Sequence, residues 1–491
     1  MSTVPQVRIR ALNSAPLHPD RSWVRYWMVA QRRTKSNFAL DRAIELAVEL
    51  DRPLVVLEAL RCDYPWASDR MHAFVIDGMA DNAKAFASSN ALYWPYVEPE
   101  RGAGSGLVER LGRDSAAIVT DDWPGLFIPR MTTQLAERVD VRVESVDSNG
   151  MFPMRATERS FSRAFDFRRF LQKELPAHLT TAPRIAPLRS KLRPCPALPR
   201  DVTERWPSIA GALEADDRRW IADLPIDHAI GPVEYRGGSR AGTRTLNRFV
   251  SERLDRYGEE RNHPDKDTAS GLSPWLHFGH VSAHDVFAAV TSREDWTPDA
   301  LGSKASGKRA GWWGLSPSGE GFLDQLVTWR ELGFNGSSQR DDYDRYSSLP
   351  DWAQATLAEH AGDRRPHVYS REEFDHAATD DQVWNAAQHQ LRSEGRIHNY
   401  LRMLWGKKIL HWSESPESAL ETMIELNDKY AVDGRDPNSY SGIFWVLGRY
   451  DRAWGPEREV FGKIRYMSSD NTRRKLRLTS YLEQWSDEPV S

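Results

Sequence analysis

Short apolar runs alternate with amphipathic helical patterns in the first part of the chain. The apolar runs that predict buried strands are Trp23–Ala30, Pro53–Leu60, Ala91–Val97, Ala116–Thr120 and Val139–Val143. Between them lie helical patterns such as Asn37–Leu50 and Met71–Ser88. This alternation predicts a parallel sheet with helices on both faces. We therefore expect an α/β, Rossmann-like amino-terminal domain over residues 20–175.

The pattern changes after this predicted domain. Prolines crowd residues 180–207, which indicates an interdomain linker, and we place it at residues 176–217. Beyond about Arg218, strand-like segments become scarce and amphipathic helical patterns dominate. Residues 218–491 are therefore predicted to form a second, mostly α-helical domain.

Within the second domain, a helix is predicted after Gly395, a natural helix breaker. Its apolar side carries Ile397, Leu401, Leu404, Trp405 and Trp412. Its opposite side carries Asn399, Arg402, Met403 and Gly406. A glycine inside a helix costs about 1 kcal/mol relative to alanine, so its presence needs a reason. We expect something large to lie close against this side.

Capping residues indicate where the neighbouring helices begin. Asp381 is predicted to cap a shorter helix that bears Trp384, and Ser415 followed by Pro416 is a typical helix start. The helix from Pro416 is expected to end near Leu426. A loop rich in turns, carboxylates and amides follows it. The polar residues of interest in and beside this loop are Asn427, Asp433, Asp436 and Asn438.

These residues belong to motifs with a family likeness. The motifs are FLDQLVTWREL from Phe322, WNAAQ from Trp384, RMLWGKKILHWSESPESALE from Arg402, LNDKYAVDGRDPN from Leu426, DRAWG from Asp451, FGKIRYM from Phe461, SGLSPWLHFG from Ser270 and RYWMVAQRRTKSNFAL from Arg25. In sequence and in their order along the chain, they closely resemble the class II DNA photolyases of the photolyase/cryptochrome superfamily. The resemblance implies a flavoprotein that uses light to split cyclobutane pyrimidine dimers, by electron transfer from photoexcited FADH⁻.

The same resemblance implies a set of FAD-binding residues. On the phosphate side they are Tyr257, Ser270, Leu272 and Ser273, and Ser273–Pro274 is predicted to form an N-cap and first-turn pair. Arg402 and Asp433 match a pair beside the isoalloxazine, and Asn427 matches the residue facing its reactive edge. The remaining predicted cofactor-binding residues are Asn399, Asp436 and Asn438. The amino-terminal domain is expected to be able to hold an antenna chromophore, whose identity the sequence does not give.

Tryptophans carry the remaining chemistry that the resemblance implies. The residues that return electrons to the flavin are matched by Trp384, Trp405 and Trp412. If the family resemblance is set aside, the sequence favours core packing for these three tryptophans. Trp329 and Trp445 match an aromatic clamp around a flipped-out lesion. Met403 matches a lesion-facing methionine, with a gap-filling core side chain as the alternative.

Two basic stretches are candidates for DNA contact. In the run Arg449–Arg477 we single out Arg449, Arg452, Lys463 and Arg465, against the alternative of a solvated helix face. The loop Ala300–Gly321 carries Lys304, Lys308, Arg309, Trp312 and Trp313. It suits DNA contact through charge and stacking and equally suits a solvated insertion.

Two departures from the family bear on the substrate. Class II enzymes have a glutamate where this chain has Gln325, and a glutamine there resembles the 6-4 photolyases. Asn399 and Met403 favour the cyclobutane-dimer enzymes. The segment before Asp451 is one residue shorter than in the family and lacks its histidine. A 6-4 photolyase and a cryptochrome-like light sensor without repair activity are therefore the alternatives.

Composition adds limits on partners and compartment. The formal net charge is -4, so a DNA site must be a local patch rather than a whole-molecule basic field. The two cysteines, Cys62 and Cys195, form no CxxC pair, which argues for a reducing compartment and against zinc or an iron–sulfur cluster. Neither a signal peptide nor a bilayer-spanning apolar run is evident. We expect a cytoplasmic monomer that binds ultraviolet-damaged DNA, with no metal and no membrane partner.

Overall fold

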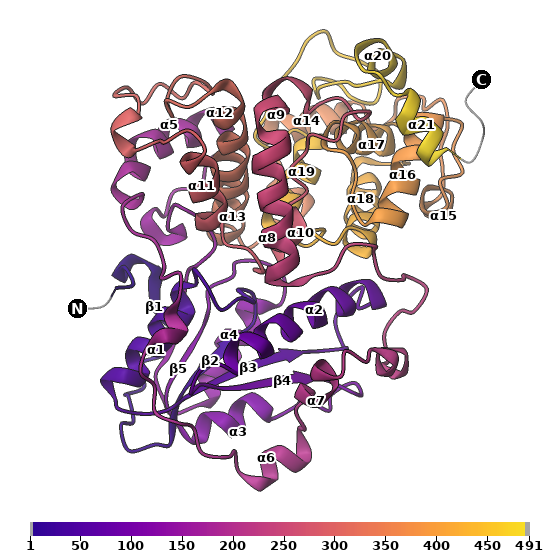
Figure 1. The fold of residues 1–491 in the computed structure, drawn as a ribbon. Helices are drawn as coiled ribbons and strands as arrows, with labels where there is room; N and C mark the ends of the chain where they lie inside the picture. Colours follow the sequence, from indigo (N-terminus) through magenta and orange to yellow (C-terminus); the bar gives the residue numbers. More distant parts are fainter. Residues whose placement is uncertain (1–2, 487–491) are drawn as a thin grey trace. The chain divides into compact units, whose positions relative to one another are not determined.

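The computed structural model describes residues 3–486. The chain forms two compact units that interleave along the sequence (Figure 1). The first unit comprises the chain up to Thr157 together with Leu175–Asn247 and Gly271–Ala289. The second comprises Glu158–Glu174, Arg248–Ser270 and the chain from Val290 onward. The domain limits at residues 175 and 218 stay a prediction.

A mostly parallel sheet forms the centre of the first unit. Its six strands run in the order β1-β6-β5-β2-β3-β4, and only β1 is antiparallel to its neighbour. The strands are β1 (Ile9–Ala11), β2 (Trp23–Met28), β3 (Leu54–Leu60), β4 (Leu92–Val97), β5 (Ser115–Asp121) and β6 (Val143–Val146). β2, β3 and β5 are almost wholly buried, as expected for strands covered on both faces.

Two strand predictions need correction. The last strand was expected at Val139–Val143 but begins at Val143, because Val139 still serves as the C-cap of helix α4 (Ile128–Arg138). β1 was not predicted, since three residues that include Arg10 give no apolar run. The other four predicted strands are confirmed to within two residues at each end.

The first unit also contains helices. They are α1 (Phe38–Glu49), α2 (Asp69–Phe86), α3 (Leu107–Arg113), α4, α6 (Arg200–Arg205), α7 (Ala210–Glu214) and α10 (Ser273–His277), and α11 (Ala283–Ser292) begins in this unit. Asn37 caps α1, because its side chain accepts hydrogen bonds from the backbone N–H groups of Ala39 and Leu40. The predicted linker is packed within this unit, where Trp206 Nε1 donates to Ala103 O at 2.9 Å.

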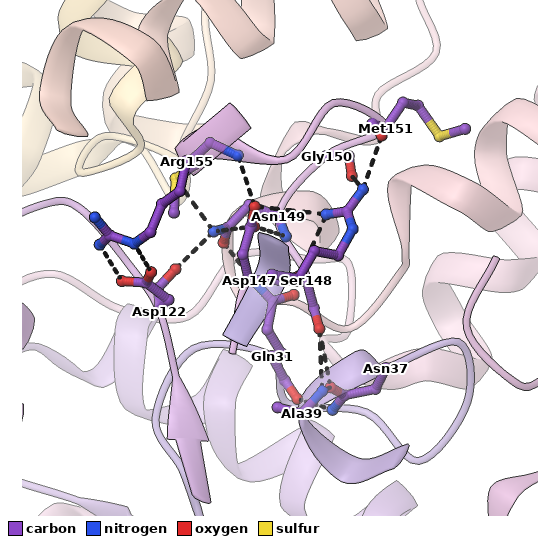
Figure 2. Close-up of polar contacts among 12 residues, drawn as sticks. Gln31, Asn37, Ala39, Asp122, Asp147, Ser148, Asn149, Gly150, Met151 and Arg155 are labelled. Atoms are coloured by element: carbon purple, nitrogen blue, oxygen red, sulfur yellow. Dashed lines mark hydrogen bonds and ion pairs between the residues drawn. The ribbon is translucent and has the colours of Figure 1, made fainter. Parts of the chain in front are cut away.

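A buried polar network joins the loops after β2, β5 and β6 (Figure 2). Asn149 Nδ2 donates to Asp122 O at 2.6 Å and to Asp147 Oδ1 at 2.9 Å. Gln31 Nε2 donates to Asn149 Oδ1 at 2.7 Å, and Arg155 Nε donates to Asp122 Oδ2 at 2.7 Å. The network satisfies these buried polar groups and thereby fixes the loops at the carboxyl ends of the strands.

Helices are the main elements of the second unit in the part of the chain that the structure describes. Its helices are α5 (Ala164–Glu174), α9 (Leu254–Glu260), α12 (Pro317–Leu323), α13 (Arg330–Gln339), α14 (Asp351–Glu359), α15 (Arg371–Asp375), α16 (Gln382–Glu394), α17 (Asn399–Trp412), α18 (Pro416–Tyr430), α19 (Pro437–Val446), α20 (Ser469–Lys475) and α21 (Thr479–Trp485). A π-helical segment, η8 (Asp324–Trp329), joins α12 to α13. Helix α8 (Gly238–Arg248) belongs to the first unit except for Arg248, which begins the second segment of this unit.

Two kinds of feature are absent from the described residues. No helix within residues 3–486 is both long and apolar enough to cross a membrane. The same residues hold no group of three or more His, Cys, Asp or Glu side chains that could ligate a metal ion.

Candidate functional site

Helices α16 and α17 form the framework of the site, and their ends follow the predicted signals. The Asp381 carboxylate caps α16 by accepting hydrogen bonds from Val383 N at 3.1 Å and Trp384 N at 3.2 Å. Gly395 ends this helix in the left-handed conformation, at φ 65°, which glycine adopts without strain. The two helices then pack against each other.

The structure explains the glycine in the middle of α17. A Cβ atom on Gly406 would lie 2.6 Å from Val446 Cγ2, closer than two carbon atoms can approach. Gly406 therefore lets α19 pack directly on α17. The sequence predicted a large neighbour against this side of the helix. At Gly406 that neighbour is helix α19.

Helix α18 is longer than predicted. Ser415 caps it by accepting from Ser418 N, as expected, but the helix runs to Tyr430 instead of ending near Leu426. Tertiary contacts hold the extra turn, because Asp428 Oδ2 accepts from Tyr440 OH at 2.7 Å. Asn427 lies in this turn, where its Nδ2 donates to Gly434 O at 2.8 Å.

Three tryptophans from α16 and α17 form one buried cluster. The rings of Trp384 and Trp405 are parallel to within 3°, with centroids 6.5 Å apart. Trp412 meets Trp384 edge-on, at 73° and 6.1 Å between centroids. Their exposed fractions are 0% for Trp384, 2% for Trp405 and 4% for Trp412. The three predicted electron-transfer residues are thus brought together in a continuous aromatic path.

A glutamine that the sequence analysis did not single out holds this cluster in place. Trp405 Nε1 donates to Gln388 Oε1 at 2.9 Å, and Gln388 Nε2 donates to Asp375 O at 3.3 Å. Gln388 is fully buried. It lies one helical turn after Trp384, so the sequence places it on the same face of α16 but does not show which indole it contacts.

Arg402 and Asp433 form a partly exposed pair, and Arg402 lies about one turn before Trp405 on α17. Arg402 Nη2 lies 3.5 Å from Asp433 Oδ1, and the side chains are 18% and 8% exposed. Asp433 Oδ1 is buried and accepts no hydrogen bond from the described residues. A buried carboxylate oxygen in this state suits a ligand that donates from a ring N–H, so the pair fits an isoalloxazine ring.

The other predicted cofactor-binding residues of this region differ in exposure. Asp436 is buried and caps α19 by accepting from Asn438 N at 2.8 Å. Asn438 and Asn399 are exposed, each close to the start of a helix. The structure therefore gives Asp436 a structural role as a cap and leaves the two amides accessible.

The four predicted phosphate-side residues are divided between the units. Tyr257 (buried) and Ser270 (half-buried) belong to the second unit, and Leu272 (buried) and Ser273 (exposed) to the first. The prediction that Ser273 is an N-cap is wrong. Helix α10 begins at Ser273, and Leu272 takes the cap position without a side-chain hydrogen bond. Leu272 already has helical backbone angles, which moves the helix start one residue earlier than the Ser-Pro signal indicates.

The residues predicted to contact the lesion are partly exposed. Gln325 and Trp329 lie four positions apart on η8, and both are half-buried among buried neighbours. Met403 and Trp445 are also half-buried. A Cβ atom on Gly442 would lie 3.9 Å from Met403 Cε, so this methionine rests beside α19. Short π-helical segments of this kind often occur at functional sites.

A column of alternating cations and indoles leads away from Trp445. The Arg465 guanidinium lies 5.3 Å from the Trp445 ring centre and 3.9 Å from that of Trp454. Arg452 lies 4.4 Å from the Trp454 ring on the exposed surface. Buried Lys407 lies 5.2 Å from the Trp445 ring, and burial lowers its pKa to about 7. Lys407 was not predicted, because its position on α17 gives no sign of this contact.

Other predicted DNA contacts are placed differently. Arg449 is buried, and its Nη2 donates to Tyr343 O at 2.7 Å, so its guanidinium is used inside the protein. Lys463 is exposed and pairs with Glu457 at 3.0 Å. In the loop Ala300–Gly321, Trp312 and Trp313 are each only 5% exposed. The alternative of base stacking by these two tryptophans is therefore wrong, although the basic side chains of the loop stay exposed.

Comparison with known sequences gives a consistent group of relatives. No family model matches the chain. A deoxyribodipyrimidine photo-lyase from Methanothermobacter thermautotrophicus is 33% identical over 478 residues, which cover 97% of each chain. The enzyme of the same name from Potorous tridactylus is 32% identical, over 93% of this chain and 80% of its own. That from Arabidopsis thaliana is 31% identical, over 97% and 92%.

Comparison with solved structures concerns the fold. A class III photolyase from Agrobacterium tumefaciens superposes with a TM-score of 0.66 at 15% identity, over 95% of this chain and 86% of its own. A cryptochrome from Synechocystis sp. PCC6803 gives 0.65 at 14% identity, over 94% and 88%. The predicted fold class, an α/β amino-terminal part followed by a mostly helical part, is confirmed.

Proposed function

The chain belongs to the deoxyribodipyrimidine photo-lyases, within the photolyase/cryptochrome superfamily, and on that premise we propose that it repairs cyclobutane pyrimidine dimers in DNA with light. The proposed reaction needs an electron donor, a dry pocket and a means of holding a flipped-out lesion. It needs neither a metal nor a general base.

FAD is the proposed cofactor, and when bound and reduced it supplies the photoexcited electron donor. Arg402 and Asp433 would hold its ring by a charge-assisted contact on one side of α17. The unsatisfied Asp433 oxygen supports this assignment. Asn427 is proposed to face the ring, with its amide oriented by Gly434 O and by Ser439 Oγ, which accepts from Nδ2 at 3.1 Å.

One feature of α17 supports the proposal more than any other. Its Arg402 and Met403 are partly exposed, whereas Trp405 and Trp412 on the same helix are buried in the aromatic cluster. A single rigid element thus connects the proposed flavin and lesion pocket to the proposed electron path. Electrons would pass from Trp412 through Trp384 and Trp405, which contact one another in that order.

Trp329 and Trp445 are proposed to clamp the lesion. Their half-buried rings can stack on bases, and such stacking contributes about 1–3 kcal/mol per base. Arg452, Lys463 and Arg465 are the proposed contacts to DNA phosphates. Arg449 is left out of this set because it is buried.

Gln325 favours one alternative function, a 6-4 photolyase. A glutamine can donate and accept hydrogen bonds to a pyrimidine but carries no negative charge. Blue-light irradiation of oligonucleotides that contain both lesions separates these functions. Our proposal predicts that cyclobutane dimers disappear in the light and persist in the dark, while 6-4 products persist in both. Loss of 6-4 products alone would support the alternative, and loss of neither would support a light sensor.

A further inference from the structure

The ring of Trp412, the most exposed of the three indoles, lies beside a lysine ammonium that forms an ion pair with an aspartate. Lys408 Nζ lies 4.8 Å from the centre of the Trp412 ring. The same ammonium lies 3.0 Å from Asp381 Oδ2, and the two side chains are only 14% and 13% exposed. A cation and an anion are therefore held together, partly desolvated, beside one of three contacting indoles.

Asp381 connects this ion pair to the backbone of Trp384. Its Oδ1 atom caps α16 through Val383 N and Trp384 N, while Oδ2 faces Lys408 and also accepts a hydrogen bond from the Ser469 hydroxyl. The carboxylate is thus fixed by several donors. It also holds the Lys408 ammonium at the ring of Trp412.

The two charges act on Trp412 in opposite directions. A cation over the face of an indole stabilises the neutral ring, and it repels the positive charge that the ring gains when an electron leaves. A carboxylate next to that cation offsets the repulsion. Partial burial makes both effects larger than they would be in water. The neighbouring His411 adds no charge at neutral pH, because burial lowers its pKa to about 4.

We propose that Lys408 and Asp381 are positioning residues that set how readily Trp412 gives up an electron. This proposal rests on the proposed function, in which Trp405 would give one electron to the bound flavin. Trp405 is then reduced by Trp384, and Trp384 by Trp412, so that the positive charge ends on Trp412. Lys408 limits the stability of that charge, and Asp381 restores part of it.

The test is transient absorption of the tryptophan radical after a blue flash, on the FAD-loaded protein with oxidised flavin. In Lys408→Met, which keeps the length of the side chain without its charge, the radical decays about three- to thirtyfold more slowly than in the wild type. In Lys408→Arg the decay stays near that of the wild type. In Asp381→Asn the radical decays faster, because Asn still caps the helix but no longer offsets the ammonium.

The chain offers a matched control. Lys429 Nζ also pairs with an aspartate, Asp375, at 2.7 Å, and lies 5.0 Å from an aromatic ring, that of Tyr430. Lys429→Met should leave the decay of the tryptophan radical unchanged.

Opposite shifts in Lys408→Met and Asp381→Asn separate an electrostatic effect from a structural one, since damage to packing would shift both variants in the same direction. Equal decay in all variants, or shifts of the same sign, would overturn the inference and leave the proposed electron path intact. A wild-type protein that forms no tryptophan radical would overturn both.

Discussion

The indole N–H of Trp384 donates to the backbone carbonyl of Trp405 at 3.0 Å, while the two rings lie parallel to within 3°. This bond joins the side chain of Trp384 on α16 to the backbone of α17 at Trp405, and both residues are proposed to carry electrons. Because both ends are buried, the relative position of the rings is fixed by the same contact that holds the helices together.

Replacing Trp405 by Phe should interrupt the proposed path. Phenylalanine keeps an aromatic ring in the core, but it is much harder to oxidise than an indole. We expect photoreduction of the oxidised flavin to be abolished, while chemically reduced enzyme still repairs dimers. Absorbance of the flavin under blue light measures the first effect. Unchanged bleaching in the variant would contradict the assignment.

Replacing Gln388 by Ala should destabilise the protein. The Trp405 N–H group would lose its partner inside the core, which costs about 1–3 kcal/mol in the free energy of unfolding. Urea unfolding measures this difference. Gln382→Ala on the same helix serves as the control, because its side-chain oxygen accepts from the exposed Arg473 at 2.9 Å. Equal stability of the two variants would argue against the role of Gln388.

Replacing Trp445 by Ala should weaken lesion binding. Loss of one stacking surface lowers affinity for dimer-containing DNA by about 1–3 kcal/mol, roughly five- to 150-fold. Affinity for undamaged DNA should change little, because it depends mainly on phosphate contacts. Titration of both DNAs into the variant tests this, and an equal loss for both would show that Trp445 contributes no lesion-specific contact.

Lys407 should make stability depend on pH. Burial lowers its pKa in the folded protein to about 7 from the ordinary 10.5. Above pH 7 the unfolded chain therefore binds more protons than the folded one, and stability rises with pH, by at most about 1.4 kcal/mol per pH unit. Below pH 7 both states are protonated, and the cost of burying the charge applies in full.

Lys407→Met removes this dependence. The free energy of unfolding of the wild type, minus that of the variant, should increase from about pH 7 to pH 9. Urea unfolding at several pH values measures it. Parallel curves for the two proteins would contradict the lowered pKa.

Sequence patterns predicted the elements that depend on local signals. Asp381 and Ser415 cap helices as expected, since each side chain bonds to backbone only two or three residues away. The buried strands were recognisable because both faces of the sheet are covered. The N-cap prediction for Ser273 was wrong because the same Ser-Pro signal is compatible with a helix that begins one residue earlier.

The predictions that failed, or could not be made, depend on contacts between distant segments. Arg449 is buried where its guanidinium donates a hydrogen bond to Tyr343 O, and Tyr343 is distant in the sequence. The packing of Trp312 and Trp313 likewise depends on tertiary structure. The contacts of Gln388 and Lys408 join separate helices, and no local spacing encodes them. The glycine at position 406 signalled a close neighbour, but only the structure shows that it is α19.

Uptake of FAD tests the central claim most directly. The purified chain, freed of flavin, is mixed with FAD and separated from the excess, and the absorbance of the retained flavin is compared with the protein concentration. We predict about one FAD per chain for the wild type. Asp433→Ala, which removes the unsatisfied carboxylate, should retain much less. A folded wild-type chain that retains no flavin would contradict the account.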